Sequence, residues 1–448
     1  MDELPLSIPN TPAPPPAPIA TLPPDPDLKR RVALAAGLAI VWGALTLLAQ
    51  FTGALDTFEE PLLDWRQSLA TCPTPPSDQL ALVAIDSIPA DRPWPWSRLD
   101  YSLVLRSLID YLPQSVVFEM NLNDRDTEHE SYDDTFSHVI QRGPRVVFAA
   151  TLLTRKESAS PPAKLDLLTW TGSTEHVPRY GSAIWPLQTF AGSSPVGVNN
   201  LESESGQRLR RLPLVFLLDH KMIPSLVLQA AAQLLGADLT TSEVQLGRAI
   251  FLKRTDGRLL RTIPIDNEGR LRIRYHPGPT ASWQASFDNI MVYDDQLQHC
   301  LKPERDLHAL ARRQVWIGRT DSNERINFNT AIGPLSRTEV QLQAERTILD
   351  QDYVRPLPPM ILALLYLLIA IGGATAVVRL GRVPAVALLI ILGSFWFESA
   401  ILAFRLYNVI LPLPSFGLLL FGTYIVGLLA FYWDLAPEED PRQLPLGL

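Results

Sequence analysis

The sequence predicts a membrane-anchored α/β protein, and two features carry this prediction. Four apolar segments each run for about twenty residues, the length that a helix needs to cross the hydrocarbon core of a bilayer. Between the first and second of these segments, short apolar runs alternate with helix-like patterns. We therefore expect four transmembrane α-helices, one N-terminal and three C-terminal, and one large α/β domain outside the cytoplasm.

The predicted spans cover residues 32–51, 358–378, 383–404 and 409–433. Basic residues precede the first span at Lys29–Arg31 and lie between the second and third spans at Arg379 and Arg382. Because Lys and Arg are enriched in cytoplasmic loops, both clusters predict cytoplasmic termini and place residues 52–355 outside. No small-residue cleavage site follows the first span, so we interpret it as an uncleaved anchor.

The two tails and the net charge limit the possible activities and partners of the chain. Residues 1–28 contain ten prolines and no aromatic residue, which predicts a disordered cytoplasmic tail. Residues 434–448 form a short cytoplasmic tail with no room for a catalytic module. The net charge of −8 argues against nucleic acid as a partner and leaves the lipid bilayer and other proteins.

In the large domain, apolar runs predict an open, mostly parallel sheet. The runs are largely apolar on both faces, as expected for strands of a covered parallel sheet, and segments with apolar residues at helical spacing lie between them. The predicted strands are Leu80–Ile85, Ser115–Met120, Arg145–Ala150 and Gln314–Gly318, and the predicted helices between them are Arg98–Leu112 and Tyr132–Gln141.

The later part of the domain predicts an antiparallel β extension. Ile263–Ile265 and Leu271–Tyr275 flank the turn sequence Asn267-Glu268-Gly269, which predicts a β-hairpin. Pro224–Leu235 is predicted as a helix with proline in its first turn, and Thr338–Leu349 as the last helix before the membrane.

Small residues form a stripe on the first span. Ala35, Ala39 and Gly43 recur every four residues, which permits close approach of another helix. We expect this stripe to pack against the other spans of the same chain, and we leave open a homodimer formed by the large domain.

Taken in order along the chain, short motifs make the sequence similar to a known family. They begin with Leu63-Asp64-Trp65-Arg66, Val83-Ala84-Ile85-Asp86, Trp94-Pro95-Trp96-Ser97-Arg98 and Val117-Phe118-Glu119. They continue with Gly197-Val198-Asn199, Arg210-Arg211-Leu212-Pro213-Leu214, Pro224-Ser225-Leu226, Ile265-Asp266 with Gly269, Ile273-Arg274-Tyr275, Val315-Trp316-Ile317-Gly318 and Arg355-Pro356-Leu357-Pro358. The chain resembles the CHASE-2 family, the second type of extracellular sensory domain associated with cyclases and histidine kinases. It departs from the family pattern at Glu119, where Asp is usual, and at Gln343-Ala344, where His-Ala is common.

The resemblance implies a sensor in a bacterial inner or internal membrane. The family usually carries a cytoplasmic effector and this chain ends without one, so we expect it to signal in trans to a separate membrane or cytoplasmic protein. The alternative is a non-catalytic structural or assembly subunit of a larger membrane complex. No GxSxG, HExxH, GxxxxGK[ST] or GxGxxG motif is present, so we expect no enzyme, and we expect neither a metal nor a cofactor.

A candidate ligand site lies where the parallel strands end. Open α/β sheets bind ligands at the carboxyl ends of their strands, and polar or aromatic residues follow three of the predicted strands. The alternatives are that the carboxylates cap helices and that the aromatic residues only pack. The candidate residues are Asp86, Trp94, Trp96, Arg98, Glu119, Thr320 and Asn323.

Two further pairs of residues are of interest. Glu398 is the only acid within the predicted spans, and Arg405 follows it by seven residues on the same helix face. Cys72 and Cys300 are the only cysteines, and both lie in loops at the amino ends of the predicted sheet. Outside the cytoplasm they would form a disulfide if they are close enough; otherwise they are two free thiols.

Overall fold

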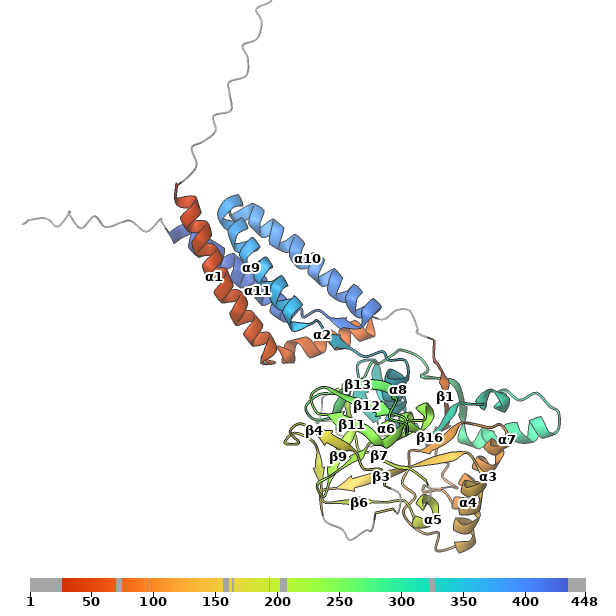
Figure 1. Cartoon of the computed structure of the whole chain (residues 1–448). Helices are drawn as coiled ribbons and strands as arrows, with labels where there is room; N and C mark the ends of the chain where they lie inside the picture. Colours follow the sequence, from red (N-terminus) through yellow and green to blue (C-terminus); the bar gives the residue numbers. More distant parts are fainter. Residues whose placement is uncertain are drawn as a thin grey trace, which may run out of the picture. The chain divides into compact units, whose positions relative to one another are not determined.

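The computed structural model describes residues 26–69, 75–92, 94–155, 161–162, 165–192, 194–201, 208–321 and 327–433. They divide into two compact units, shown in sequence colours in Figure 1. The described parts of Met1–Leu55, Pro358–Trp396 and Pro414–Leu448 form what we call the helical unit. Asp56–Leu357 and Phe397–Leu413 form what we call the globular unit. The two predicted tails lie largely outside the described residues.

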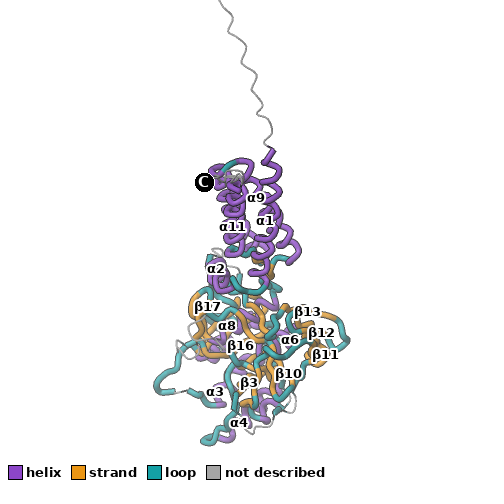
Figure 2. The backbone as a smooth tube through the Cα atoms, turned by 90° about the vertical axis from the view of Figure 1, so that its left-hand side faces the viewer, coloured by secondary structure: helices purple, strands orange, loops and turns teal. Residues whose placement is uncertain are grey.

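The helical unit contains most of the length of the predicted spans. Its helices are α1 (Pro26–Phe51), α9 (Pro359–Leu380), the first part of α10 (Arg382–Tyr407) and α11 (Pro414–Tyr432). All four helices are long and apolar enough to cross a membrane. Figure 2 shows α1, α9 and α11 alongside one another, and these three pack together. The prediction for the fourth span was wrong at its start: it begins at Pro414, because Val409–Ile410 forms a short strand.

The small-residue stripe packs within the chain, which confirms the prediction. Ala35 and Ala39 are fully buried. A methyl group added at Gly43 would lie 3.3 Å from Leu367 Cδ2 and 3.5 Å from Ala370 Cβ, both on α9. The stripe therefore lets α1 approach α9 closely.

A seven-stranded sheet, mostly parallel, forms the centre of the globular unit. Its order is β15-β1-β16-β2-β3-β6, with β7 also paired to β3, and only the β3–β6 pairing is antiparallel. The strands are β1 (Ser77–Ile85), β2 (Ser115–Phe118), β3 (Arg145–Leu153), β6 (Ser182–Ile184), β7 (Val196–Val198), β15 (Ala281–Ser286) and β16 (Gln314–Arg319). All four predicted strands are present, as β1, β2, β3 and β16.

Helices cover both faces of this sheet, so the fold has three layers. One face packs against α3 (Arg98–Ile109), α4 (Glu130–Arg142) and α7 (Phe287–Gln298), which lie together on one side in Figure 1. The other face packs against α6 (Leu226–Leu235) and α8 (Arg337–Leu349). Alternate residues of each strand enter opposite cores, which explains why the strands are apolar throughout.

Smaller sheets complete the globular unit. A four-stranded sheet has the order β13-β12-β11-β4, a three-stranded sheet the order β10-β9-β5, and three strand pairs are β14-β8, β17-β18 and β19-β20. Their bounds are β4 (Thr169–Thr171), β5 (Arg179–Tyr180), β8 (Arg211–Pro213), β9 (Val215–Leu218), β10 (Lys221–Pro224), β11 (Asp238–Gln245), β12 (Ala249–Lys253), β13 (Leu259–Pro264), β14 (Arg270–Arg272), β17 (Asn327–Thr330), β18 (Gly333–Ser336), β19 (Arg355–Pro356) and β20 (Val409–Ile410). The remaining short helices are α5 (Gln188–Ala191) and a 3₁₀ turn at Leu307–Leu310.

The predicted hairpin at Asn267-Glu268-Gly269 was wrong. The turn exists, since the Gly269 N–H donates to Asp266 O at 3.0 Å, but the strands on its two sides pair elsewhere. Strand β13 pairs with β12, and β14 pairs with β8. The β12–β13 hairpin closes instead at Asp256-Gly257, with Gly257 at a φ of 81°, a sequence that favours tight hairpin turns.

Two helix predictions need correction. The helix predicted to start at Pro224 starts at Leu226, because Pro224 belongs to β10 and the Ser225 side chain caps the helix. Helix α2 (Asp56–Ser68) was not predicted, and it contains the Leu63-Asp64-Trp65-Arg66 motif.

Helix α8 is buried on every side and starts with a capping box. All its residues from Thr338 to Leu349 are buried except Glu339. Ser336 Oγ accepts from the Glu339 N–H at 3.3 Å, and Glu339 Oε2 accepts from the Ser336 N–H at 2.9 Å. These bonds satisfy two donors at the start of the helix.

Replacing Ser336 by Ala should lower the free energy of unfolding by about 1 kcal/mol, because the helix loses its cap. Ser336→Thr keeps the hydroxyl and should recover most of this loss. The measurement is urea unfolding of the full chain in detergent. Equal stability of the two variants would contradict the role of the cap.

Candidate functional site

Polar side chains gather where the parallel strands end, and we call five of them the edge cluster. Glu119 follows β2, Thr151 lies near the end of β3, Asn199 follows β7, and Arg337 and Thr338 start α8. The cluster therefore joins three strand ends to the first turn of the buried helix α8.

Glu119 is the central acid of the edge cluster. It is only 5 % exposed, and its Oε2 accepts from Thr338 Oγ1 at 3.4 Å. Its Oε1 lies 3.8 Å from Arg337 Nη1 and accepts no hydrogen bond from any described residue. Burial raises the pKa of Glu119 to about 7, although Arg337 and Thr338 favour the charged form. The carboxyl group therefore changes its protonation near neutral pH.

Asn199 connects the other members of the edge cluster. Its Nδ2 donates to the Glu119 carbonyl oxygen at 2.9 Å, and its Oδ1 accepts from Thr151 Oγ1 at 2.7 Å. The Gln341 side chain of α8 donates to the Asn199 carbonyl oxygen at 3.4 Å. A shift of any one strand end would therefore disturb hydrogen bonds to α8.

The structure does not bring the other predicted residues into this cluster. Asp86 is exposed and accepts from Ser286 Oγ at 2.9 Å. The Thr320 N–H donates to Ile85 O at 3.0 Å. No hydrogen bond or ion pair joins Asp86 or Thr320 to Glu119 within the described ranges. Asn323 lies outside them.

The two tryptophans have different surroundings. Trp96 is buried against Phe287, with ring centroids 5.1 Å apart, and its Nε1 donates to Arg92 O at 3.1 Å. Trp94 is half-buried, and the Arg319 guanidinium lies 5.0 Å from its ring centroid. The packing alternative therefore describes Trp96, while Trp94 lies partly open at the surface.

Arg98 contacts both the segment that precedes α4 and α4 itself. Its Nη2 donates to the Asp124 carbonyl oxygen at 2.7 Å, and its Nε lies 3.5 Å from Asp133 Oδ1. Arg98 thus contacts Asp124 and Asp133, and no hydrogen bond or ion pair joins it to Glu119 among the described residues. Among the described residues, no group of His, Cys, Asp or Glu has the arrangement of a metal site.

Helix α8 carries a second buried acid that the sequence analysis missed. Glu345 is fully buried, and its Oε2 accepts from Trp316 Nε1 at 2.6 Å. Its Oε1 has no hydrogen-bond partner among the described residues. Burial raises the pKa of Glu345 to about 8, although the hydrogen bond from Trp316 favours the charged form. The sequence feature that could have indicated it is the group of polar residues within the last predicted helix before the membrane, which includes Gln341, Gln343 and Arg346.

The end of α8 leads into a charged network within the globular unit. His276 Nε2 lies 2.8 Å from Asp352 Oδ2, and Arg274 Nε lies 3.9 Å from the same oxygen. Burial alone would raise the pKa of Asp352, but the hydrogen bond and charge of His276, with Arg274, lower it overall. The Asp352 carboxylate also accepts from Asn408, next to β20.

Helix α2 carries a separate buried ion pair. Arg66 Nη2 lies 2.6 Å from Glu59 Oε1, and both side chains are buried. Glu59 also accepts from the Leu413 N–H, and Arg66 donates to Leu411 O. The α2 helix is thereby fixed to the segment that precedes α11.

The remaining predicted residues stay unconnected to the cluster. Glu398 and Arg405 are exposed on α10, with no ion pair between them in the described part of the chain. Cys300 is a free, exposed thiol, and Cys72 lies outside the described residues. The disulfide between Cys72 and Cys300 therefore stays a prediction.

Together, the three-layer domain with its edge cluster and the four apolar helices define a membrane-anchored α/β protein. The sequence model of the CHASE2 domain matches residues 37–376. The chain therefore belongs to the CHASE2 domain family, a family of sensory domains. No curated protein and no solved structure matched the chain.

Proposed function

We propose that this chain is a non-catalytic, membrane-anchored sensor whose globular unit lies outside the cytoplasm and which signals in trans to a separate protein. The observation that carries the proposal is the placement of α8. This helix starts in the edge cluster, is buried along its length, and ends at Leu349, shortly before α9 begins at Pro359.

A helix buried all round suits the transmission of a signal. Its surroundings are close-packed, so it moves between discrete packings rather than deforming gradually. A stimulus that repacks the edge cluster would shift α8 through Thr338 and Gln341, and α8 would pull on the segment that enters α9.

The distribution of basic residues supports the proposed orientation. The Arg382 guanidinium lies 5.5 Å from the Tyr432 ring centroid, and Arg30 and Arg31 line a hollow with Trp433. The basic residues near the start of α1 and at the start of α10 therefore lie at the same end of the helical unit. By the positive-inside rule, this end is cytoplasmic.

Cysteine labelling on intact cells tests the orientation. In a chain with Cys72 and Cys300 replaced by Ser, a cysteine at exposed Asp256 should react with a membrane-impermeant maleimide. A cysteine at exposed Leu380 should react only after the membrane is permeabilised. The opposite pattern would refute the extracytoplasmic placement.

Signalling in trans is tested by purifying the tagged full chain in mild detergent. The proposal expects a partner with a cytoplasmic kinase, cyclase or comparable signalling domain. Repeated recovery of the chain alone would contradict it. A stable complex whose other members lack signalling domains would instead favour the structural or assembly subunit.

A further inference from the structure

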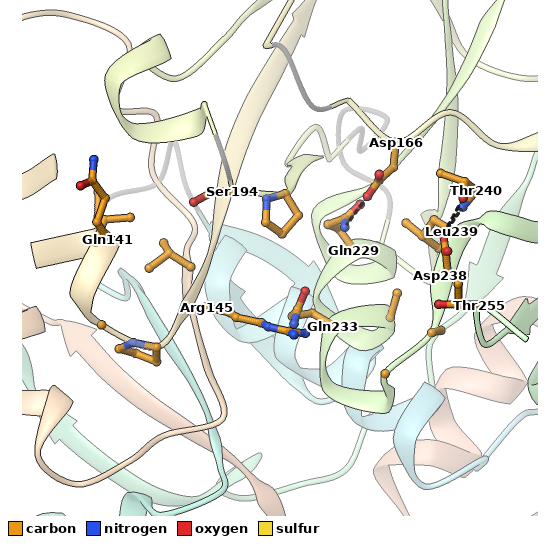
Figure 3. A pocket seen from close by; sticks show the side chains of 18 residues that line it. Gln141, Arg145, Asp166, Ser194, Gln229, Gln233, Asp238, Leu239, Thr240 and Thr255 are labelled. Atoms are coloured by element: carbon orange, nitrogen blue, oxygen red, sulfur yellow. Dashed lines mark hydrogen bonds between the residues drawn. The ribbon is translucent and has the colours of Figure 1, made fainter. Parts of the chain in front are cut away.

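The globular unit has a polar pocket at the opposite edge of the central sheet from the edge cluster. Its volume is about 690 Å³. Figure 3 shows that its walls come from the end of α4, the start of β3, the segment before β7, and α6 with the following strand β11. The pocket thus lies at the amino ends of β3 and β7, and the sequence analysis did not predict it.

One part of the pocket offers only hydrogen-bond acceptors. Gln229 is 4 % exposed, and its Nε2 donates to Asp166 Oδ2 at 3.0 Å. This bond turns the amide so that Gln229 Oε1 is buried, and this oxygen accepts no hydrogen bond from the described residues. A buried amide oxygen that accepts no hydrogen bond lowers the stability of the folded state by about 1–3 kcal/mol. Together with the Asp166 carboxylate, it requires a donor, and a cationic donor fits best.

Another part of the pocket offers donors. Arg145, the first residue of β3, is exposed and forms no ion pair with any described residue. Gln233 lies one helical turn after Gln229 on the same face of α6. Figure 3 draws Arg145 and Gln233 in the lower part of the pocket, below Asp166 and Gln229. A guanidinium with a neighbouring amide fits a carboxylate.

We propose that this pocket binds a small zwitterion of the α-amino-acid type. The ligand's ammonium group donates to Asp166 and to Gln229 Oε1, and its carboxylate accepts from Arg145, with Gln233 nearby. The pocket also has apolar walls that can take an aliphatic side chain. These walls are formed by Pro144, Pro195, Ala232, Ala237 and Leu239.

The pocket is connected to α8 through helix α6. Gln229 and Gln233 both lie on α6, and α6 packs against α8. A ligand that fixes α6 would therefore bias the packing of α8. This inference rests on the proposed sensory function for its biological meaning, but binding can be measured without it.

The test is a thermal-shift and calorimetry screen of the full chain in detergent against the twenty common amino acids. We expect at least one to bind, with a melting temperature that rises with its concentration. The same compound as its amide, which lacks the carboxylate, and as its deaminated acid, which lacks the ammonium group, should each bind at least ten-fold more weakly.

Substitutions of pocket residues test whether the ligand binds in this pocket. Asp166→Asn and Arg145→Gln should each weaken binding at least ten-fold and leave the melting temperature without ligand close to that of the wild type. The matched controls Asp295→Asn and Arg305→Gln remove exposed charges outside the pocket lining and should bind as the wild type does.

Two results would overturn the inference: no binding of any amino acid at millimolar concentration, or binding that the Asp166 and Arg145 variants leave unchanged. The proposed function fails separately. If an amino acid binds in the pocket but the chain has no signalling partner, the site stands and the sensor is refuted. If a signalling partner is found but no amino acid binds, only the inference falls.

Discussion

Gly197→Ala should strongly destabilise the globular unit. Gly197 lies in β7, and a methyl group at its position would be 2.5 Å from the Leu226 Cα and 2.8 Å from both the Leu226 nitrogen and the Ser225 carbonyl oxygen. These are backbone atoms at the start of α6, so no side chain can rotate away. Overpacking typically costs about 1–3 kcal/mol, and we expect at least the upper end of that range.

Thermal unfolding of the full chain in detergent, followed by near-ultraviolet circular dichroism, measures this effect. Gly372→Ala is the matched control, because the same methyl group at this exposed position of α9 meets no atom within 4 Å. The control should unfold as the wild type does. A Gly197→Ala chain with an unchanged melting temperature would show that β7 and α6 are not packed as described.

Glu345→Gln should remove a large part of the pH dependence of stability. The pKa of Glu345 is raised from 4.5 to about 8 in the folded chain, so the folded state holds this proton more tightly than the unfolded state. The stability that the proton contributes is fully present below about pH 4.5 and is lost as the pH rises through about 8. By pH 9 the loss is on the order of a few kcal/mol.

Glutamine cannot ionise, and its side-chain oxygen can still accept from Trp316 Nε1. The melting temperature of Glu345→Gln should therefore exceed that of the wild type at pH 9 and fall less between pH 6 and 9. Glu175→Gln removes an exposed carboxylate and should keep the wild-type pH profile. Parallel profiles of wild type and Glu345→Gln would contradict a buried, proton-binding Glu345.

Glu119 adds a second transition to the wild-type profile. Its pKa is raised to about 7, so its contribution to stability is lost as the pH rises through neutrality. This transition should persist in the Glu345→Gln variant, which lets melting temperatures between pH 6 and 8 separate the two acids.

The sequence by itself determined the class of the protein. Span length and apolarity identified four helices, and short runs apolar on both faces identified strands of the central parallel sheet. Both are properties of single segments. Helix packing within the chain was predicted from the small-residue stripe of Ala35, Ala39 and Gly43, which is likewise a property of one segment. Glu119 was found from its place near the end of a predicted strand, since parallel strands end at one edge.

Only the tertiary structure decided which segments meet. Strand β16, near the end of the domain, inserts between β1 and β2, and β14, which follows Gly269, pairs with β8 much earlier in the chain. Local turn chemistry cannot specify such partners, because they depend on burial shared by distant segments. The burial of Glu345, and the pocket of Asp166, Gln229 and Arg145, follow from the same long-range packing. A residue's sequence neighbours do not show whether its side chain will lose water, so the pKa of Glu345 and the exposed state of Asp86 became visible only in the folded chain.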